Sequence, residues 1–133
     1  MSAVDSLNTR VAPWLLSLMR MVSAFLFMQH GGQKLLGFPA PPNNPVELMS
    51  LIGLAGALEL FGGALLLVGL FSRPIAFVLS GMMAVAYFMV HAPQGFWPML
   101  NGGELAAMYS FAFLYLAFAG PGPLSLDRLF GGR

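Results

Sequence analysis

Four long apolar stretches fill most of this chain, and they constrain its fold more than any other feature. They run over residues 13–36, 46–70, 74–91 and 104–119. A helix needs about 20 apolar residues to cross a bilayer core that is about 30 Å thick. The stretches therefore predict an all-α fold, an integral membrane four-helix bundle that occupies residues 1–133 as a single domain.

The segments between these stretches cannot continue a helix. Residues 37–45 read GFPAPPNNP, and residues 92–103 read APQGFWPMLNGG. Proline removes a backbone donor and breaks helices, so both segments are predicted loops. Shorter breaks follow at FSRP, residues 71–74, and at GPGPLSLD, residues 120–127.

Composition agrees with a membrane protein and excludes several function classes. Only 8% of the residues are charged, against roughly 25% in ordinary globular proteins. The six Lys and Arg residues are scattered, so nothing predicts a nucleic-acid partner. The chain contains no cysteine, which excludes thiolate metal ligands and cysteine redox chemistry within it. Electrons would therefore need a cofactor or a partner protein.

The positions of the cations predict the topology. The loops 37–45 and 92–103 contain no Lys or Arg. The opposite side would hold Arg10, Arg73, Arg128 and Arg133. The positive-inside rule then places both termini in the cytoplasm and the protein in the inner (plasma) membrane as a multi-pass protein.

The second apolar stretch contains a carboxylate near its middle, where burying a charge in the bilayer costs the most free energy. Residues 53–70 read GLAGALELFGGALLLVGL, with Glu59 near the middle. A charge at mid-bilayer costs from about 2.5 to more than 10 kcal/mol, so Glu59 should face a partner. Counting depth along antiparallel helices predicts Arg20 first and His30 second, and the glycines would let that helix come close. The pair could be a structural clasp or a proton-handling group.

A second ionisable group gathers near the loop side. His30 and Lys34 are four residues apart and share a helix face. His91 ends the third stretch, and Asn101 and Glu104 precede or open the fourth. These side chains predict a polar pocket between helix ends. Each also has a structural reading: a helix cap for Glu104, a snorkelling Lys34 and an interfacial His91.

The sequence gives only weak support for a copper site or a haem site. The ten methionines form no tight cluster for copper, so core filling explains them better, and no metal site is predicted. Two histidines could ligate haem, but a pair in a helix bundle is weak support for it.

The ordered motifs resemble the DoxX family of small bacterial four-helix membrane proteins. They are LMRMVSAFLFMQHGGQKLLGF, ELFGGALLLVGLFSRPIAFVL, AVAYFMVHAPQGFWP and GGELAAMYSFAFLYLAFAGPGPLSLD. The resemblance implies a role in membrane redox processes, because family members are associated with quinol oxidase, with thiosulfate:quinone oxidoreduction and with defence against oxidative stress. The predicted catalytic residues are Glu59, His91 and Glu104, and the predicted cofactor-binding residues are His30, Lys34, Arg20 and Asn101.

Three functions are compatible with these residues. The first is a quinone-linked or oxidative-stress subunit that acts with soluble or membrane redox partner proteins, as a subunit of a membrane oxidoreductase complex. A quinone head needs hydrogen-bond donors and a proton path, which His, Lys and Glu can supply. The alternatives are a non-catalytic membrane scaffold and a small-molecule or lipid transporter, for which four helices would require a homodimer.

Overall fold

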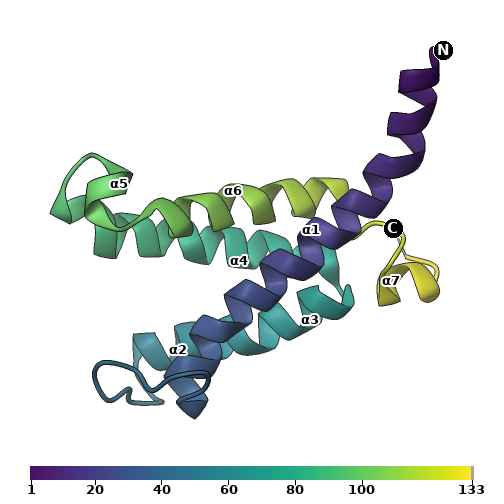
Figure 1. The fold of residues 1–133 in the computed structure, drawn as a ribbon. Helices are drawn as coiled ribbons and strands as arrows, with labels where there is room; N and C mark the ends of the chain where they lie inside the picture. Colours follow the sequence, from purple (N-terminus) through teal and green to yellow (C-terminus); the bar gives the residue numbers. More distant parts are fainter. Residues whose placement is uncertain (133) are drawn as a thin grey trace.

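The fold is a set of apolar helices joined by short connections (Figure 1). This computed structural model describes residues 1–132, in which there is no β-strand. Arg133, one of the cations used to predict topology, lies outside the described residues. Both termini lie at one end of the molecule, which we call the termini end. The loops 37–50 and 92–103 lie at the other end, which we call the loop end.

The first helix, α1 (Ala3–Leu36), is much longer than predicted. The Ser2 side chain and the Asp5 side chain cap its start reciprocally, and Gly37 in the left-handed conformation ends it. Pro13, the predicted start, lies inside the helix. At 1.5 Å per residue α1 is about 50 Å long, more than the bilayer core requires. Its first turns project away from the other helices (Figure 1).

The second helical run begins later than predicted. It comprises α2 (Leu51–Ala57), the π-helical segment η1 (Leu58–Gly62) and α3 (Gly63–Val68). The Ser50 hydroxyl caps it by accepting from Gly53 N at 3.2 Å. Because the helix starts at Leu51 and not at Val46, each of its residues lies nearer the loop end of α1 than predicted.

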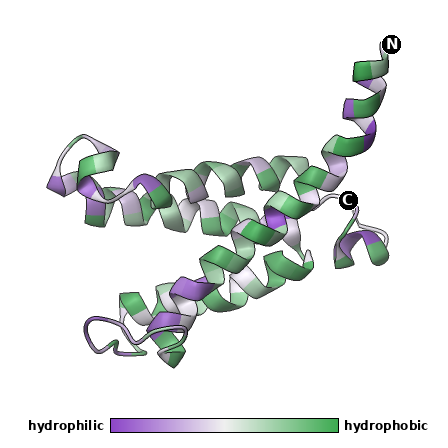
Figure 2. Cartoon of the chain, viewed as in Figure 1, coloured by the Kyte–Doolittle hydropathy of each residue, from purple (hydrophilic) through white to green (hydrophobic). Residues whose placement is uncertain are grey.

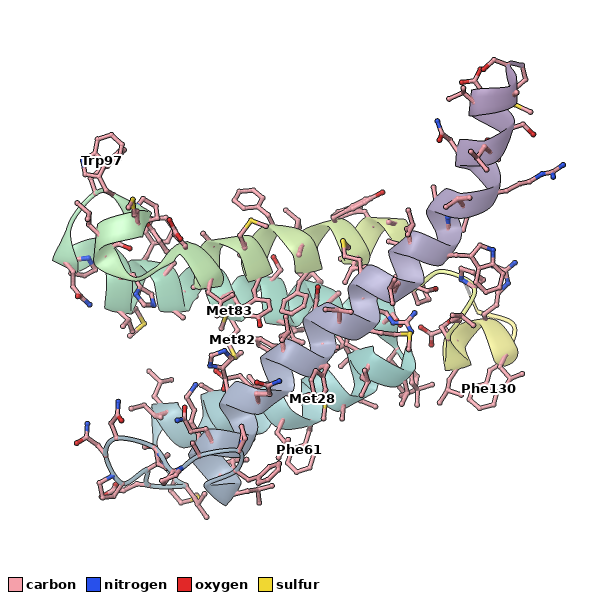
Figure 3. The ribbon with its side chains drawn as sticks, in the orientation of Figure 1. Met28, Phe61, Met82, Met83, Trp97 and Phe130 are labelled. Atoms are coloured by element: carbon pink, nitrogen blue, oxygen red, sulfur yellow. The ribbon has the colours of Figure 1, made fainter. Side chains whose placement is uncertain are left out.

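The remaining helices form the other half of the molecule. The third run comprises α4 (Ser72–Ala86), the π-helical segment η2 (Tyr87–His91) and the short 3-10 turn η3 (Ala92–Gln94). It is followed by α5 (Pro98–Asn101), α6 (Glu104–Ala119) and α7 (Leu126–Leu129). Trp97 projects from the connection between η3 and α5, with 64% of its surface exposed (Figure 3).

Three helical runs are long and apolar enough to cross a membrane. They are Ala3–Leu36, Leu51–Val68 and Ser72–Gln94. The fourth, α6, is equally apolar in character but has 16 residues. Hydrophobic side chains cover the outward faces of all four (Figure 2). The described chain is thus an all-helical protein suited to a bilayer, and the fourth crossing stays a prediction.

The helices are arranged as two pairs. In one pair α1 packs along α2, η1 and α3, and in the other α4 packs along α6. The pairs meet near the middle and the termini end, where Phe27, Leu66, Leu79 and Phe113 are fully buried. They diverge toward the loop end (Figure 1). This splayed arrangement positions the candidate site.

The termini end is closed by the C-terminal segment. Arg20 of α1 is 1% exposed and donates to the carbonyl oxygens of Pro121 and Leu124, the latter at 2.6 Å. The Asp127 carboxylate accepts from the backbone N–H groups of Phe71 and Ser72 at 2.8 and 2.9 Å. These contacts bind residues 121–127 to the start of α4 and to the middle of α1.

Candidate functional site

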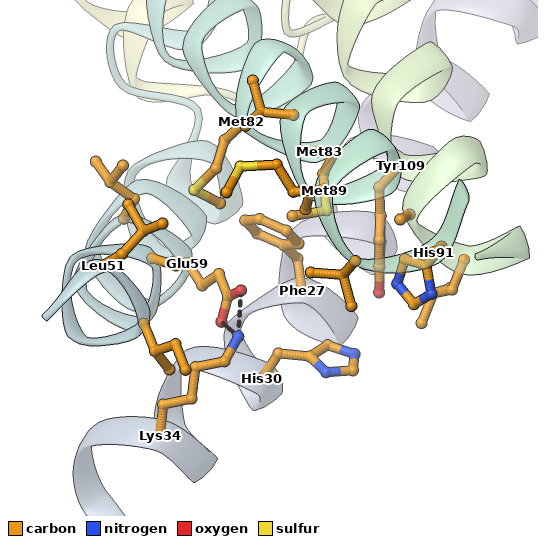
Figure 4. A pocket seen from close by; sticks show the side chains of 18 of the residues that line it. Phe27, His30, Lys34, Leu51, Glu59, Met82, Met83, Met89, His91 and Tyr109 are labelled. Carbon is orange, nitrogen blue, oxygen red and sulfur yellow. Dashed lines mark hydrogen bonds and ion pairs between the residues drawn. The ribbon is translucent and has the colours of Figure 1, made fainter. Parts of the chain in front are cut away.

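A cavity of about 560 Å³ lies between the two helix pairs at the loop end (Figure 4). All four long helical runs contribute to its walls. Most of the lining is apolar, including Met82 and Met83, which extend from α4 into the space between the pairs (Figure 3). The polar lining side chains are His30, Lys34, Glu59, His91 and Tyr109. An apolar cavity with a few convergent polar groups is the usual form of a small-molecule site.

Glu59 is paired with Lys34 in the cavity wall (Figure 4). Lys34 Nζ lies 2.6 Å from Glu59 Oε1 and 2.8 Å from Oε2. The Glu59 side chain is 5% exposed and that of Lys34 is 28% exposed. The predicted partners, Arg20 and His30, were therefore wrong.

The cause of that error is the start of the second helix. The depth count assumed a start at Val46, whereas the helix begins at Leu51. Glu59 therefore lies only about two turns from the loop end, beside Gly31 of α1, and the long side chain of Lys34, about one turn nearer the loop end, reaches it. Arg20 lies instead at the termini end, where it binds backbone carbonyl oxygens.

Two glycines allow the close helix approach that this ion pair requires. A Cβ at Gly31 of α1 would lie 2.6 Å from Gly56 O and 2.9 Å from Glu59 Cβ. A Cβ at Gly56 would lie 3.0 Å from Lys34 Cβ. The predicted use of glycine for close approach is confirmed at these positions, although the cation brought to Glu59 is Lys34.

Both π-helical segments contribute an ionisable residue to the cavity. Glu59 belongs to η1, and His91 belongs to η2. One-turn π segments inside α-helices insert a residue, shift the side chains around it and occur frequently at functional sites. Here they fall on the two helices that face each other across the cavity.

His91 is held by a network of hydrogen bonds at the loop end. Its Nδ1 lies 3.0 Å from the carbonyl oxygen of Asn101. Because a carbonyl only accepts, Nδ1 carries the proton and Nε2 of the neutral ring is left as an acceptor. The Asn101 side chain donates to the Tyr87 hydroxyl at 3.2 Å and accepts from Gly103 N at 2.8 Å. Asn101 thus positions His91 and does not itself line the cavity.

Tyr109 of α6 is a cavity residue that sequence reasoning missed. It is 6% exposed, and its hydroxyl has no hydrogen-bond partner within residues 1–132. Its ring stacks on Phe113 at 5.4 Å and packs edge-on against Phe27 at 5.2 Å. An unmade hydrogen bond of a buried hydroxyl costs about 1–3 kcal/mol. A tyrosine within an apolar helix was the available signal, because such hydroxyls usually find a partner when buried.

The structure brings one of the remaining predicted site residues to this cavity and leaves two away from it. His30 is exposed overall, but its ring lines the cavity and lies edge-on to Tyr109 at 6.4 Å. Glu104 is exposed in the first turn of α6 and is not among the lining residues. Arg20 lies at the other end of the bundle. The cavity therefore joins His30, Lys34, Glu59 and His91, and leaves Arg20, Asn101 and Glu104 outside.

Comparison with known proteins places these residues in a family context. A family model described as DoxX matches residues 15–92. An uncharacterized protein of Haemophilus influenzae is 44% identical over 123 residues, covering 89% of this chain and 92% of the relative. The inner membrane protein YphA of Escherichia coli is 30% identical over 132 residues, covering 87% and 90%. No solved structure matches the chain.

Proposed function

The chain belongs to the DoxX family and is a multi-pass inner-membrane protein, and from this premise we propose that it is a quinone-linked subunit of a membrane redox system. The observation that carries the proposal is the Lys34–Glu59 ion pair in the wall of an apolar cavity. Ionisable residues inside membrane segments are rare, usually pair with one another, and mark pathways for protons and substrates.

The side chains of the cavity fit a quinone. Its walls are apolar and suit a hydrophobic ring and tail, and its polar groups gather near the loop end. Tyr109 offers an unpartnered buried hydroxyl that can donate to a quinone carbonyl, and His91 offers Nε2, which in the neutral ring can accept from a quinol hydroxyl. Lys34 and Glu59 lie on the opposite helix pair (Figure 4). His30, Lys34, Tyr109 and His91 would hold the ring.

The chain's own contribution is proton management and orientation. A bound quinone supplies two-electron, two-proton chemistry. Glu59 can hold a proton when its contact with Lys34 loosens, and His91 Nε2 can accept one while Asn101 keeps the ring oriented. Protons are thus held at Glu59 Oε and His91 Nε2, on facing walls of the cavity.

Electrons must arrive from a partner protein, because the chain has no cysteine and no recognisable electron carrier of its own. We expect that partner to be a soluble or membrane redox protein, and the complex to contain one or two copies of this chain. Glu104, outside the cavity, remains a candidate for proton exchange with the loop side.

We further propose four membrane crossings with both termini in the cytoplasm. The cations Arg10, Arg73 and Arg128 support this orientation under the positive-inside rule. The cysteine-free chain allows a direct test with single reporters. Ser2→Cys should be protected from an impermeant thiol reagent in intact cells, and Asn44→Cys should react. If only Ser2→Cys is labelled, the termini lie outside the cytoplasm and the proposed orientation is wrong.

The proposed function is tested by quinone content and quinone binding. Protein extracted into native-membrane nanodiscs should carry extractable quinone, and Glu59→Gln and His91→Ala should each weaken quinone binding about tenfold. Glu47→Gln is the matched control, because Glu47 is exposed in the loop before α2. Absence of bound quinone, together with equal binding by all variants, would refute the proposal.

One observation favours a scaffold role as a second candidate. The first turns of α1 project from the bundle with Val4, Leu7 and Val11 exposed along one face (Figure 1). A soluble protein could bind there. Removal of residues 2–11 should abolish partner recovery from native membranes if the scaffold reading holds, while Glu59→Gln should leave it unchanged.

A further inference from the structure

The Tyr109 hydroxyl is the one buried donor in the cavity wall that lacks a partner within residues 1–132. The Glu59 carboxylate and the Lys34 ammonium already bind each other, and His91 Nδ1 is engaged by Asn101. The hydroxyl is also fixed in place, because Phe27 and Phe113 hold the Tyr109 ring on two sides. In Figure 4 it points toward the side of the cavity that carries the His30 and His91 imidazoles.

This arrangement defines the ligand atom that would complete the site. A phenolic hydroxyl donates one hydrogen bond, and a carbonyl oxygen accepts one without donating. Satisfying a rigid, buried donor gives specificity for ligands that carry the acceptor, because an analogue without it leaves the donor unpaired. The surrounding apolar lining requires the rest of the ligand to be hydrophobic.

The cavity reaches the apolar outer surface of the bundle between α2 and the run formed by α4 and η2, a surface that we expect to face lipid. Several residues line the cavity and are also more than half exposed on the outer surface. They are Leu51, Ile52 and Leu54 on one side and Val85 and Met89 on the other. All are apolar, so a lipid-soluble molecule can enter from the membrane without crossing a polar barrier.

We propose that Tyr109 is a specificity-determining residue that donates a hydrogen bond to a ring carbonyl of a lipid-soluble ligand entering between α2 and α4. The inference rests on the proposed function for the location of the site, but it does not require redox chemistry. It assigns recognition of the carbonyl to α6, while the Lys34–Glu59 ion pair lies on α1 and η1.

The test uses redox-inert probes, so that its outcome is separate from quinone chemistry. Binding of 4-decylcyclohexanone and of decylcyclohexane is measured on the full chain in nanodiscs. The wild-type protein should bind the ketone about tenfold more tightly than the hydrocarbon. Tyr109→Phe should lose that preference, with unchanged affinity for decylcyclohexane, and the ligand-free variant should be at least as thermally stable as wild type.

Tyr115→Phe is the matched control, since Tyr115 lies on the same helix and is 54% exposed outside the cavity. It should retain the full preference for the ketone. Equal binding of the two probes by the wild-type protein would overturn the inference, as would a Tyr109→Phe variant that keeps the preference. A ketone preference that depends on Tyr109 in a protein without quinone would support the inference while the proposed function fails.

Discussion

The two ends of the bundle bury charge in opposite ways. At the termini end, the buried Arg20 guanidinium is bound by backbone carbonyl oxygens of residues 121 and 124. At the loop end, the buried Glu59 carboxylate is bound by Lys34, whose side chain remains partly exposed. The hydrogen-bond partners of Arg20 are backbone groups that cannot titrate, whereas Glu59 is bound by a flexible side chain that can move.

This difference separates a structural charge from a functional one. Backbone carbonyls are fixed by the fold, so the Arg20 site has a single arrangement that joins the C-terminal segment to α1. The Lys34–Glu59 pair borders a cavity, so a ligand or a proton can compete with it. Burial alone does not distinguish the two sites; the nature of the partner and the adjacent space do.

The largest effect is expected from removing the fixed charge. Arg20→Met should lower the free energy of unfolding by about 3 kcal/mol, since hydrogen bonds to charged groups contribute about 1.5–3 kcal/mol each. Unfolding of the protein in mixed micelles, followed by tryptophan fluorescence, measures this. Arg10→Met on the exposed part of α1 is the control and should be neutral. Equal stability of both variants would remove the contrast between the ends.

The Lys34–Glu59 pair at the loop end should respond differently from Arg20, because both of its partners are side chains that can be substituted together. Lys34→Met should cost about 2 kcal/mol by leaving the buried Glu59 carboxylate unpaired, and Glu59→Gln should cost less because the Lys34 side chain is partly exposed. The double variant should be more stable than either single variant, as expected when a buried ion pair is replaced entirely. A double variant that loses the sum of both costs would show that the two residues are not coupled.

A smaller effect should follow from separating the helices that hold the pair. Gly31→Ala forces α1 and η1 apart, because its Cβ meets backbone atoms within 2.6 Å, and overpacking should cost about 1–2 kcal/mol. Quinone binding should weaken with it. Gly81→Ala, whose Cβ would meet nothing within 4 Å, should be neutral or slightly stabilising. Loss of stability in both variants would indicate a helix-wide effect and not close packing.

The smallest effect concerns the pH dependence of the termini end. Burial alone would raise the pKa of the Asp127 carboxyl, but hydrogen bonds from Ser72 and Phe71 and the charge of Arg20 lower it below its usual range. A lowered pKa in the folded state stabilises the protein above the ordinary pKa of about 4, and this stabilisation is lost as the pH falls below that value.

Asp127→Ala should therefore lose about 0.5–1 kcal/mol at pH 7 and should differ less from wild type at pH 3. Thermal unfolding at a series of pH values measures the difference. If the stability difference between Asp127→Ala and wild type is the same at pH 7 and pH 3, the Asp127 charge does not contribute to closing the termini end.

Much of the site was visible in the sequence, but not its pairing. Four of the seven predicted site residues line one cavity: His30, Lys34, Glu59 and His91. Depth counting failed for Glu59 because a shift of five residues in the helix start moves a side chain by about 7.5 Å along the membrane normal. Tyr109 was missed because its hydroxyl is distinguished only by the lack of a hydrogen-bond partner within residues 1–132, and that lack depends on the neighbouring helices.

The sequence by itself determined that this protein belongs in a membrane and which of its residues are costly to bury there. Both follow from composition along the chain, because run length and charge decide the free energy of transfer to the bilayer. Only the tertiary structure decided that Glu59 meets Lys34, that Arg20 holds the C-terminal segment and that the helix pairs diverge around a cavity. Those features depend on helix register and on close approach at Gly31 and Gly56, which bring together side chains distant in sequence.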